Sequence, residues 1–342
     1  MMRRHLPRLS LLLGVLCALQ MPLAWGADRV RMIVAGSERG TSAQIARDIA
    51  KHVAKPADIE FDLRHSAGSP DTLLRLREGG GLQFAILQAD AAEVYLGAAA
   101  RGNIEAGQLI APVRFLAPLH AEEIHFIVRS DSPLNFVHEI DKARINLGPP
   151  NGGTVLTGTS LYRLMFDTAI PDSQASFLAH PVALVKLTEQ ALDVVVLVAP
   201  QPARLLADMK AEARRFVKLL KLDPTHPGTA RVLKTYSATT IPAASYPSLL
   251  DEDLPALAIR NYLVSHGRND ALLARFANAW CQHLPQPKAA GNPGPEEAAL
   301  PVPVSGWLYA RAFERELRAC LDGKPATPET CSQVDRALGL CG

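Results

Sequence analysis

The sequence is short of aromatic residues and of basic clusters. Phe, Trp and Tyr make up 6% of the 342 residues, and the formal net charge is only +2. The first 26 residues contain three arginines and no acidic residue, so the rest of the chain carries a net charge of −1. This near-neutral body argues against a nucleic-acid-binding protein, which would concentrate basic residues on one face. A hydrophobic fraction of 48% supplies a core and excludes general disorder.

Catalytic and metal-binding motifs are also absent. The sequence has no GxSxG, no Walker loop and no GxGxxG motif. His120 and His125 are five residues apart in a stretch expected to be strand and turn, which places them on opposite faces. We therefore expect no cofactor, no metal site and no enzymatic activity. A secreted hydrolase or transferase is a further class, but no motif favours it.

The N-terminal segment 1–26 has the three parts of a secretory signal peptide. A short basic start is followed by an apolar run at 11–19, and Ala24 and Gly26 provide small residues before a cleavage site. An uncleaved anchor is the weaker alternative, because Gln20 ends the run before it could span a bilayer. The sequence predicts a periplasmic protein that is cleaved near Gly26.

Cysteines are confined to the last 62 residues of the mature chain. Four cysteines in an oxidising compartment predict two disulfides, with three possible connectivities. None of them forms a CxxC pair, which argues against zinc. The candidates are Cys281, Cys320, Cys331 and Cys341.

The order of predicted strands, loops and helices along the chain predicts two α/β units of similar size. In the first unit, strands are expected at 29–35, 59–63 and 83–87, with helices at 42–53 and 71–78. In the second unit, strands are expected at 115–119, 124–129, 143–148, 177–179, 194–198 and 216–220, with helices at 155–166 and 181–192.

These units predict two lobes and a C-terminal extension. Lobe I comprises 28–123 plus 241–284, and lobe II comprises 124–240. The chain is expected to cross between lobes at 124–129 and again at 234–241. A Pro- and Gly-rich linker follows at 285–305, and 306–342 is expected to hold an amphipathic helix and a cysteine-containing tail.

Three predicted strands end in loops of small and polar residues that open helices. These loops are 36–42, 66–69 and 148–154. Glycines let backbone amides approach a ligand, and a helix N-terminus favours an anion. Ordinary helix capping would account for any one of them. Three such loops spread over two units favour a cleft that closes on a small anion.

Five motifs, in order along 30–264, resemble the TAXI family of solute-binding subunits of TRAP-type transporters. They are the Gly-Thr turn ending at Thr41, the Ser/Gly turn at 66–71, the segments 84–90 and 119–125, and the Gly-rich loop 148–154. The resemblance implies a type II-like periplasmic binding protein with a ligand cleft between two lobes and a hinge of two crossing strands. It also implies a small organic anion or amino acid as ligand and membrane permease subunits as partners.

The sequence departs from the family pattern at several of these motifs. Ser42 and Ala43 stand where the family commonly has aromatic residues, and Asn151 begins the Asn-Gly-Gly that replaces Gly-Ser-Gly. These changes predict a pocket that is more polar or more open. Arg39 could bind a carboxylate or could be a solvated turn residue. The predicted ligand-binding residues are Ser37, Arg39, Thr41, Ser42, Ser66, Gly68, Ser69, Gln88, Asp90, Glu122, Asn151, Gly152, Gly153 and Thr154.

A different use of the same fold remains open from the sequence. A periplasmic ligand-sensing module would close on its ligand in the same way and signal to a membrane sensor. Nothing in the residues separates this role from transport.

Overall fold

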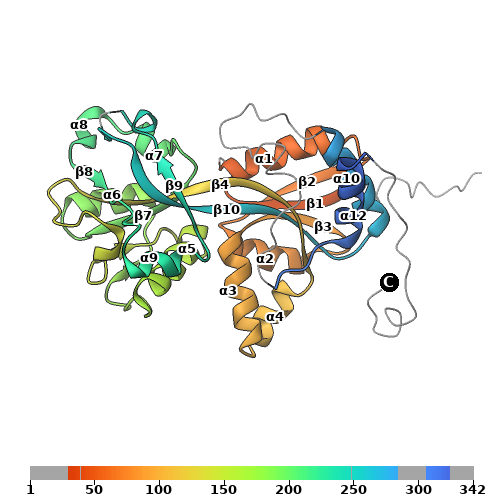
Figure 1. Cartoon of the computed structure of the whole chain (residues 1–342), viewed down its shortest axis with the longest axis horizontal. Helices are drawn as coiled ribbons and strands as arrows, with labels where there is room; N and C mark the ends of the chain where they lie inside the picture. Colours follow the sequence, from red (N-terminus) through yellow and green to blue (C-terminus); the bar gives the residue numbers. More distant parts are fainter. Residues whose placement is uncertain (1–29, 39, 248, 284–305, 324–342) are drawn as a thin grey trace, which may run out of the picture.

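A computed structural model describes residues 30–38, 40–247, 249–283 and 306–323. These residues form two lobes that lie side by side and are joined by long strands (Figure 1). The predicted signal peptide, Arg39, the linker 285–305, Cys331 and Cys341 lie outside the described residues. Within the described ranges, no helix combines the length and the apolar composition needed to cross a membrane.

Lobe I begins as the sequence predicts, with parallel strands alternating with helices. Strands β1, β2 and β3 pair in parallel in the order β2-β1-β3, so their carboxyl ends share one edge of the sheet. Helix α1 continues into a π-helical turn at Ala50–Ala54. The elements are β1 Val30–Ala35, α1 Thr41–Ile49, β2 Glu60–His65, α2 Ser69–Glu78, β3 Gln83–Gln88, α3 Ala89–Ala100 and α4 Ile104–Ile110.

Two long antiparallel strands connect the lobes (Figure 1). They are β4 Val113–Arg129 and β10 Leu254–His266, which lie side by side in the sheet order β2-β1-β3-β10-β4-β7-β5-β6. The prediction of two strands at 115–119 and 124–129 is wrong, because they are parts of β4. The polar residues between them were interpreted as a turn, but Glu122 and Glu123 stay in register with β10.

The predicted second crossing at 234–241 is also wrong. Strand β9 Ser237–Ile241 pairs only with the lobe II end of β10, so β10 itself carries the chain back to lobe I. Tyr246 is buried in one core with Ile127 and Val195, so the stretch after 241 packs in lobe II.

Lobe II repeats the α/β pattern with shorter strands. The predicted strand at 177–179 lies two residues earlier, because Asn146 of β5 fixes this stretch through its side chain, which accepts from the Leu178 N–H at 2.7 Å. The elements are β5 Ile145–Asn146, α5 Gly153–Phe166, β6 Ala175–Ser176, α6 His180–Thr188, β7 Val194–Ala199, α7 Arg204–Ala207, α8 Ala211–Arg214, β8 Val217–Leu219 and α9 Pro227–Val232.

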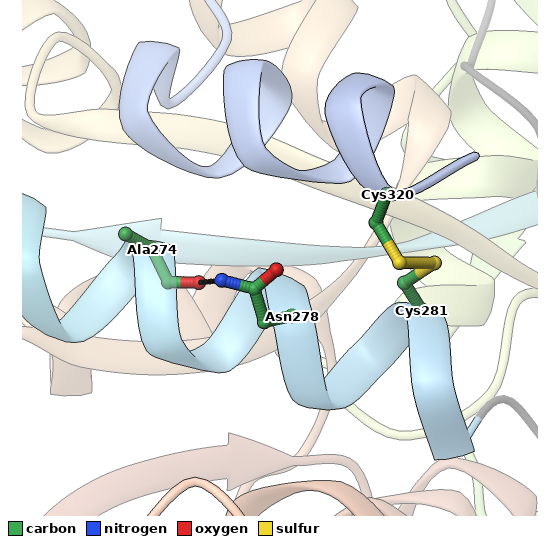
Figure 2. The surroundings of a disulfide bond; sticks show 4 residues. All are labelled: Ala274, Asn278, Cys281 and Cys320. Atoms are coloured by element: carbon green, nitrogen blue, oxygen red, sulfur yellow. Dashed lines mark hydrogen bonds between the residues drawn. A yellow bond between two sulfur atoms is a disulfide. The ribbon is translucent and has the colours of Figure 1, made fainter. Parts of the chain in front are cut away.

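The C-terminal extension packs on lobe I. Helix α10 Asp270–His283 lies against α12 Arg311–Leu321, and the Cys281–Cys320 disulfide joins them (Figure 2). The predicted amphipathic helix is confirmed but begins only after Trp307. That indole lies 5.7 Å from the Phe115 ring, and Phe115 belongs to β4. The extension is therefore tied to a strand that crosses between the lobes.

Candidate functional site

A cavity of about 470 Å³ lies between the lobes, a size typical of small-molecule sites. Its walls are the first turns of α1 and α2 from lobe I and of α5 from lobe II, together with the crossing strands. Strands β1, β2 and β3 end at this edge, where open α/β sheets bind ligands. The three loops that the sequence analysis singled out come together here.

Ten of the predicted ligand-binding residues line this cavity. They come from all three loops, from the end of β3 and from the middle of β4, which lie far apart in the sequence. The ten residues are Ser37, Thr41, Ser42, Gly68, Ser69, Gln88, Glu122, Gly152, Gly153 and Thr154.

Three other predicted residues do not line the cavity. The Ser66 hydroxyl is buried in a 2.7 Å hydrogen bond with the Thr72 hydroxyl, and Asn151 is exposed in a left-handed turn with φ 62°. Asp90 is fully buried behind the cavity. The motif places Asp90 two residues after Gln88, but α3 begins between them at Ala89, so Asp90 points elsewhere. Arg39 lies outside the described residues.

Ten further residues line the cavity that were not among the predicted ligand-binding residues. His180 opens α6 after a short strand, and this strand-to-helix signal is the one that identified the other loops. Asn261 lies in the middle of β10 and has no local signal, because it reaches the cavity only through pairing with β3 and β4. The residues missed are Gly36, Gly40, Ala67, Thr72, Ile86, Pro149, Pro150, His180, Val198 and Asn261.

The three helix starts are left without side-chain caps. Gly40, Gly68 and Gly152 occupy the N-cap positions of α1, α2 and α5, and none of these helices has a side-chain cap hydrogen bond. Unpaired N–H groups of a first turn carry about half a positive charge. Ordinary capping therefore does not explain these loops, and their donors are available to a ligand.

The floor of the cavity holds a carboxyl group. The Glu122 carboxylate accepts hydrogen bonds from Gln88 Nε2 at 3.1 Å and Asn261 Nδ2 at 3.0 Å. Burial raises the pKa of Glu122, and these two amide donors act against that rise. The neighbouring His120 is buried, and burial lowers its pKa to about 4, so its ring is neutral near pH 7. Glu122 is therefore the main titratable group facing the cavity from the floor.

The lobes touch across the cavity at two glycines. A Cβ atom on Gly68 would lie 2.1 Å from the Gly153 backbone nitrogen, and one on Gly153 would lie 2.5 Å from Gln88 Oε1. Backbone atoms at the first contact cannot move aside as a side chain would. The observed approach of α2 to α5 therefore requires glycine at position 68.

A second hollow continues the cavity toward solvent. It has a volume of about 890 Å³ and shares Ser37, Thr41 and Glu122 with the first. Arg47 of α1 and Arg204 of α7 line it, one from each lobe, and so does Glu38. This second hollow therefore has charged residues of both signs.

Comparison with known proteins identifies the family of this cleft-bearing chain. A profile of the NMT1-like family matches residues 33–274, which contain both lobes. A search of the curated proteins found no match.

Solved structures give distant likenesses. One described as a periplasmic transporter is 13% identical, with a TM-score of 0.46, over 87% of this chain and 97% of its own. The periplasmic binding protein BugD is 14% identical, with a TM-score of 0.45, over 76% and 84%. The arginine-, lysine-, histidine-binding protein ArtJ from Geobacillus stearothermophilus is 11% identical, with a TM-score of 0.39, over 74% and 94%. The chain's own topology confirms the predicted fold class: a mixed α/β fold of two lobes, joined by two long strands, with a cavity between them.

Proposed function

The chain belongs to the NMT1-like family, and we propose that it captures a small carboxylate-bearing solute between its lobes for a TRAP-type transporter. The observation that carries the proposal is the convergence of three uncapped helix N-termini on one cavity. Lobe I supplies two of these helices and lobe II the third. A bound solute would hold the lobes together, because each lobe offers only part of its contacts.

A carboxylate fits the upper walls of the cavity. The first turns of α1, α2 and α5 provide backbone donors and a favourable dipole for an anion. The hydroxyls of Thr41, Ser42 and Thr154 line the same space and can donate to its oxygens. Recognition would thus use neutral donors and would need no arginine at the carboxylate.

An amino group fits the floor. Glu122 offers an acceptor that its two amide partners hold in place, and a second carboxylate brought close to it would be repelled. Of the two ligand classes that the resemblance implies, Glu122 therefore favours an amino acid over a simple organic anion. Burial in the closed cleft would strengthen this ammonium–carboxylate contact.

The transporter partner is proposed from the motifs that resemble the TAXI family. Those motifs include the loops at Thr41, Gly68 and Thr154, which this structure brings to the cavity. Closure would give the two lobes a joint outer surface that a permease could recognise. Reconstitution with the permease subunits would test this step, since uptake that does not depend on this protein would contradict it.

Calorimetry with matched pairs of compounds tests the ligand class. Each amino acid is compared with the carboxylic acid of the same skeleton that lacks the amino group. We expect binding of at least one amino acid and much weaker binding of its deaminated partner. Equal binding within every pair would contradict the role given to Glu122, and no binding of either class would contradict the proposed function.

A further inference from the structure

A second set of side chains joins the two lobes by hydrogen bonds. None of these side chains lines the cavity. Asp90 near the start of α3 is fully buried, and its Oδ2 accepts from Thr157 Oγ1 at 2.6 Å and from the Tyr236 hydroxyl at 3.1 Å. One turn further along α3, Glu93 Oε2 accepts from Thr235 Oγ1 at 2.6 Å. Helix α3 follows β3 of lobe I, whereas the three donors belong to lobe II. We call these five residues the clasp.

Two residues of the clasp, Asp90 and Thr157, lie close in the chain to residues that line the cavity. Gln88, on the cavity floor, is two residues before Asp90, and Thr154, on the cavity wall, is one turn before Thr157. A movement of α5 away from α3 would therefore change the cavity wall and the clasp together. The contact between Gly68 and Gly153 would open in the same movement.

We propose that Asp90 is a positioning residue whose hydrogen bonds to Thr157 and Tyr236 hold α5 against α3 and thereby set the balance between open and closed lobes. This role of Asp90 rests on the proposed function, because the balance between open and closed lobes matters only if the cavity binds a solute. Asp90 itself does not touch the solute. Its effect reaches the cavity through the position of α5.

The surroundings of Asp90 make the clasp sensitive to protons. A hollow of about 320 Å³ beside it is lined by Glu93 and Arg101 of α3 and by Arg163 of α5, the charged residues that face it from these two helices. Tyr236, on the segment before β9, faces Asp90 itself through its hydroxyl. Burial raises the pKa of Asp90 from 3.8 to about 6; the Thr157 and Tyr236 hydrogen bonds counter this rise, and Glu93 adds to it.

The sign of the pH effect follows from this raised pKa. Opening brings water to Asp90 and returns its pKa toward the ordinary value, so the closed form binds a proton more tightly than the open form. The closed form is therefore favoured most below about pH 4. It loses that advantage as the pH rises from about 4 through the raised pKa of about 6.

Hydrogen exchange of the ligand-free protein tests the clasp without any knowledge of the solute. Thr157→Val removes one clasp donor, and Thr159→Val is the matched control, because the Thr159 hydroxyl bonds only to carbonyls of its own helix. We expect Thr157→Val to speed exchange roughly tenfold at the hydrogen-bonded amides of α5 around position 157, and Thr159→Val to leave it unchanged. Equal rates in the two variants would overturn the proposal.

The pH profile separates positioning from mere support of the fold. After correction for intrinsic exchange, wild-type opening should rise between about pH 4 and pH 6, and Asp90→Asn should abolish this step. Tyr236→Phe should also speed exchange, as Thr157→Val does. It provides a second variant of the clasp if Asp90→Asn does not fold. A step that persists in Asp90→Asn would overturn the proposal. Because no solute is present, these outcomes do not depend on whether the ligand assignment is correct.

Discussion

The lobe interface has two sides, the cavity side, here called the front, and the clasp side, here called the back. They differ in whether their polar groups are paired within the protein. At the front, the N-termini of α1, α2 and α5 face a cavity with no side-chain caps. At the back, Asp90 is fully buried and shares one carboxylate oxygen with two hydroxyl donors. One side keeps donors free for a solute, and the other uses donors to fix the distance between lobes. Binding and closure are thus assigned to different residues, and α5 contributes to both, through Thr154 at the cavity and Thr157 at the clasp.

The first prediction separates the interface from the stability of lobe I. Replacing Cys281 and Cys320 by serine should lower the free energy of unfolding by about 2–5 kcal/mol, because the disulfide closes a long loop between α10 and α12. Chemical denaturation measures this loss. Solute affinity at temperatures where the variant stays folded should be unchanged, since neither cysteine lines the cavity. A large loss of affinity in the folded variant would show that the front depends on the extension.

The second prediction concerns a substitution that disrupts only the cavity side of the lobe interface. Gly68→Ala should prevent closure and weaken solute binding by about a hundredfold, because its Cβ would lie 2.1 Å from the backbone of α5. Gly80→Ala is the control, since a Cβ at that position has no heavy atom within 4 Å. Small-angle scattering with and without solute should show compaction for the control and none for Gly68→Ala. Normal compaction of Gly68→Ala would mean that the lobes close along another path.

The third prediction concerns the floor and its pH dependence. Burial raises the pKa of Glu122, and a bound ammonium would lower it again. Amino-acid binding should therefore be strong above that raised pKa and should weaken as the pH falls through it. Glu122→Gln should cost roughly 1.5–3 kcal/mol of binding free energy and remove this acid dependence. Calorimetry across pH 4–8 checks both points, and an unchanged pH profile in the variant would assign the titration to another group.

The fourth prediction has the smallest effect. Thr41→Val and Thr154→Val should each weaken binding by about 1 kcal/mol, because each removes one hydroxyl donor and leaves the backbone donors in place. Calorimetry again measures the change. If both variants bind as tightly as the parent, the hydroxyls do not contact the solute and the helix N-termini act alone.

The sequence predicts most of the front because its parts are local. Glycines and hydroxyl-bearing residues at 36–42, 66–69 and 148–154 indicate where strands end and helices begin. The sheet then brings these loops to one edge. The same loops could have been capped, and only the structure shows that Gly40, Gly68 and Gly152 leave their helices uncapped.

The back and the hinge could not be predicted because their parts are distant in sequence. Asp90 accepts a hydrogen bond from Tyr236, which is 146 residues away in the sequence, so no spacing rule connects the two residues. Asn261 reaches the floor through a strand whose crossing the alternation pattern did not reveal. The polar Glu122 and Glu123 suggested a turn within β4, although pairing with β10 keeps them extended. Tertiary pairing overrides local polarity at these positions.

Native mass spectrometry of the protein, expressed with export to the periplasm, tests whether the cavity holds an amino acid between closed lobes. The wild type and Gly80→Ala should retain one small molecule that carries both an amino and a carboxyl group, and Gly68→Ala should retain none. Gentle activation should release the molecule for identification by its fragments. Retention of the same molecule by Gly68→Ala, or a retained molecule without a carboxyl group, would contradict the claim that the uncapped helix starts bind the solute between closed lobes.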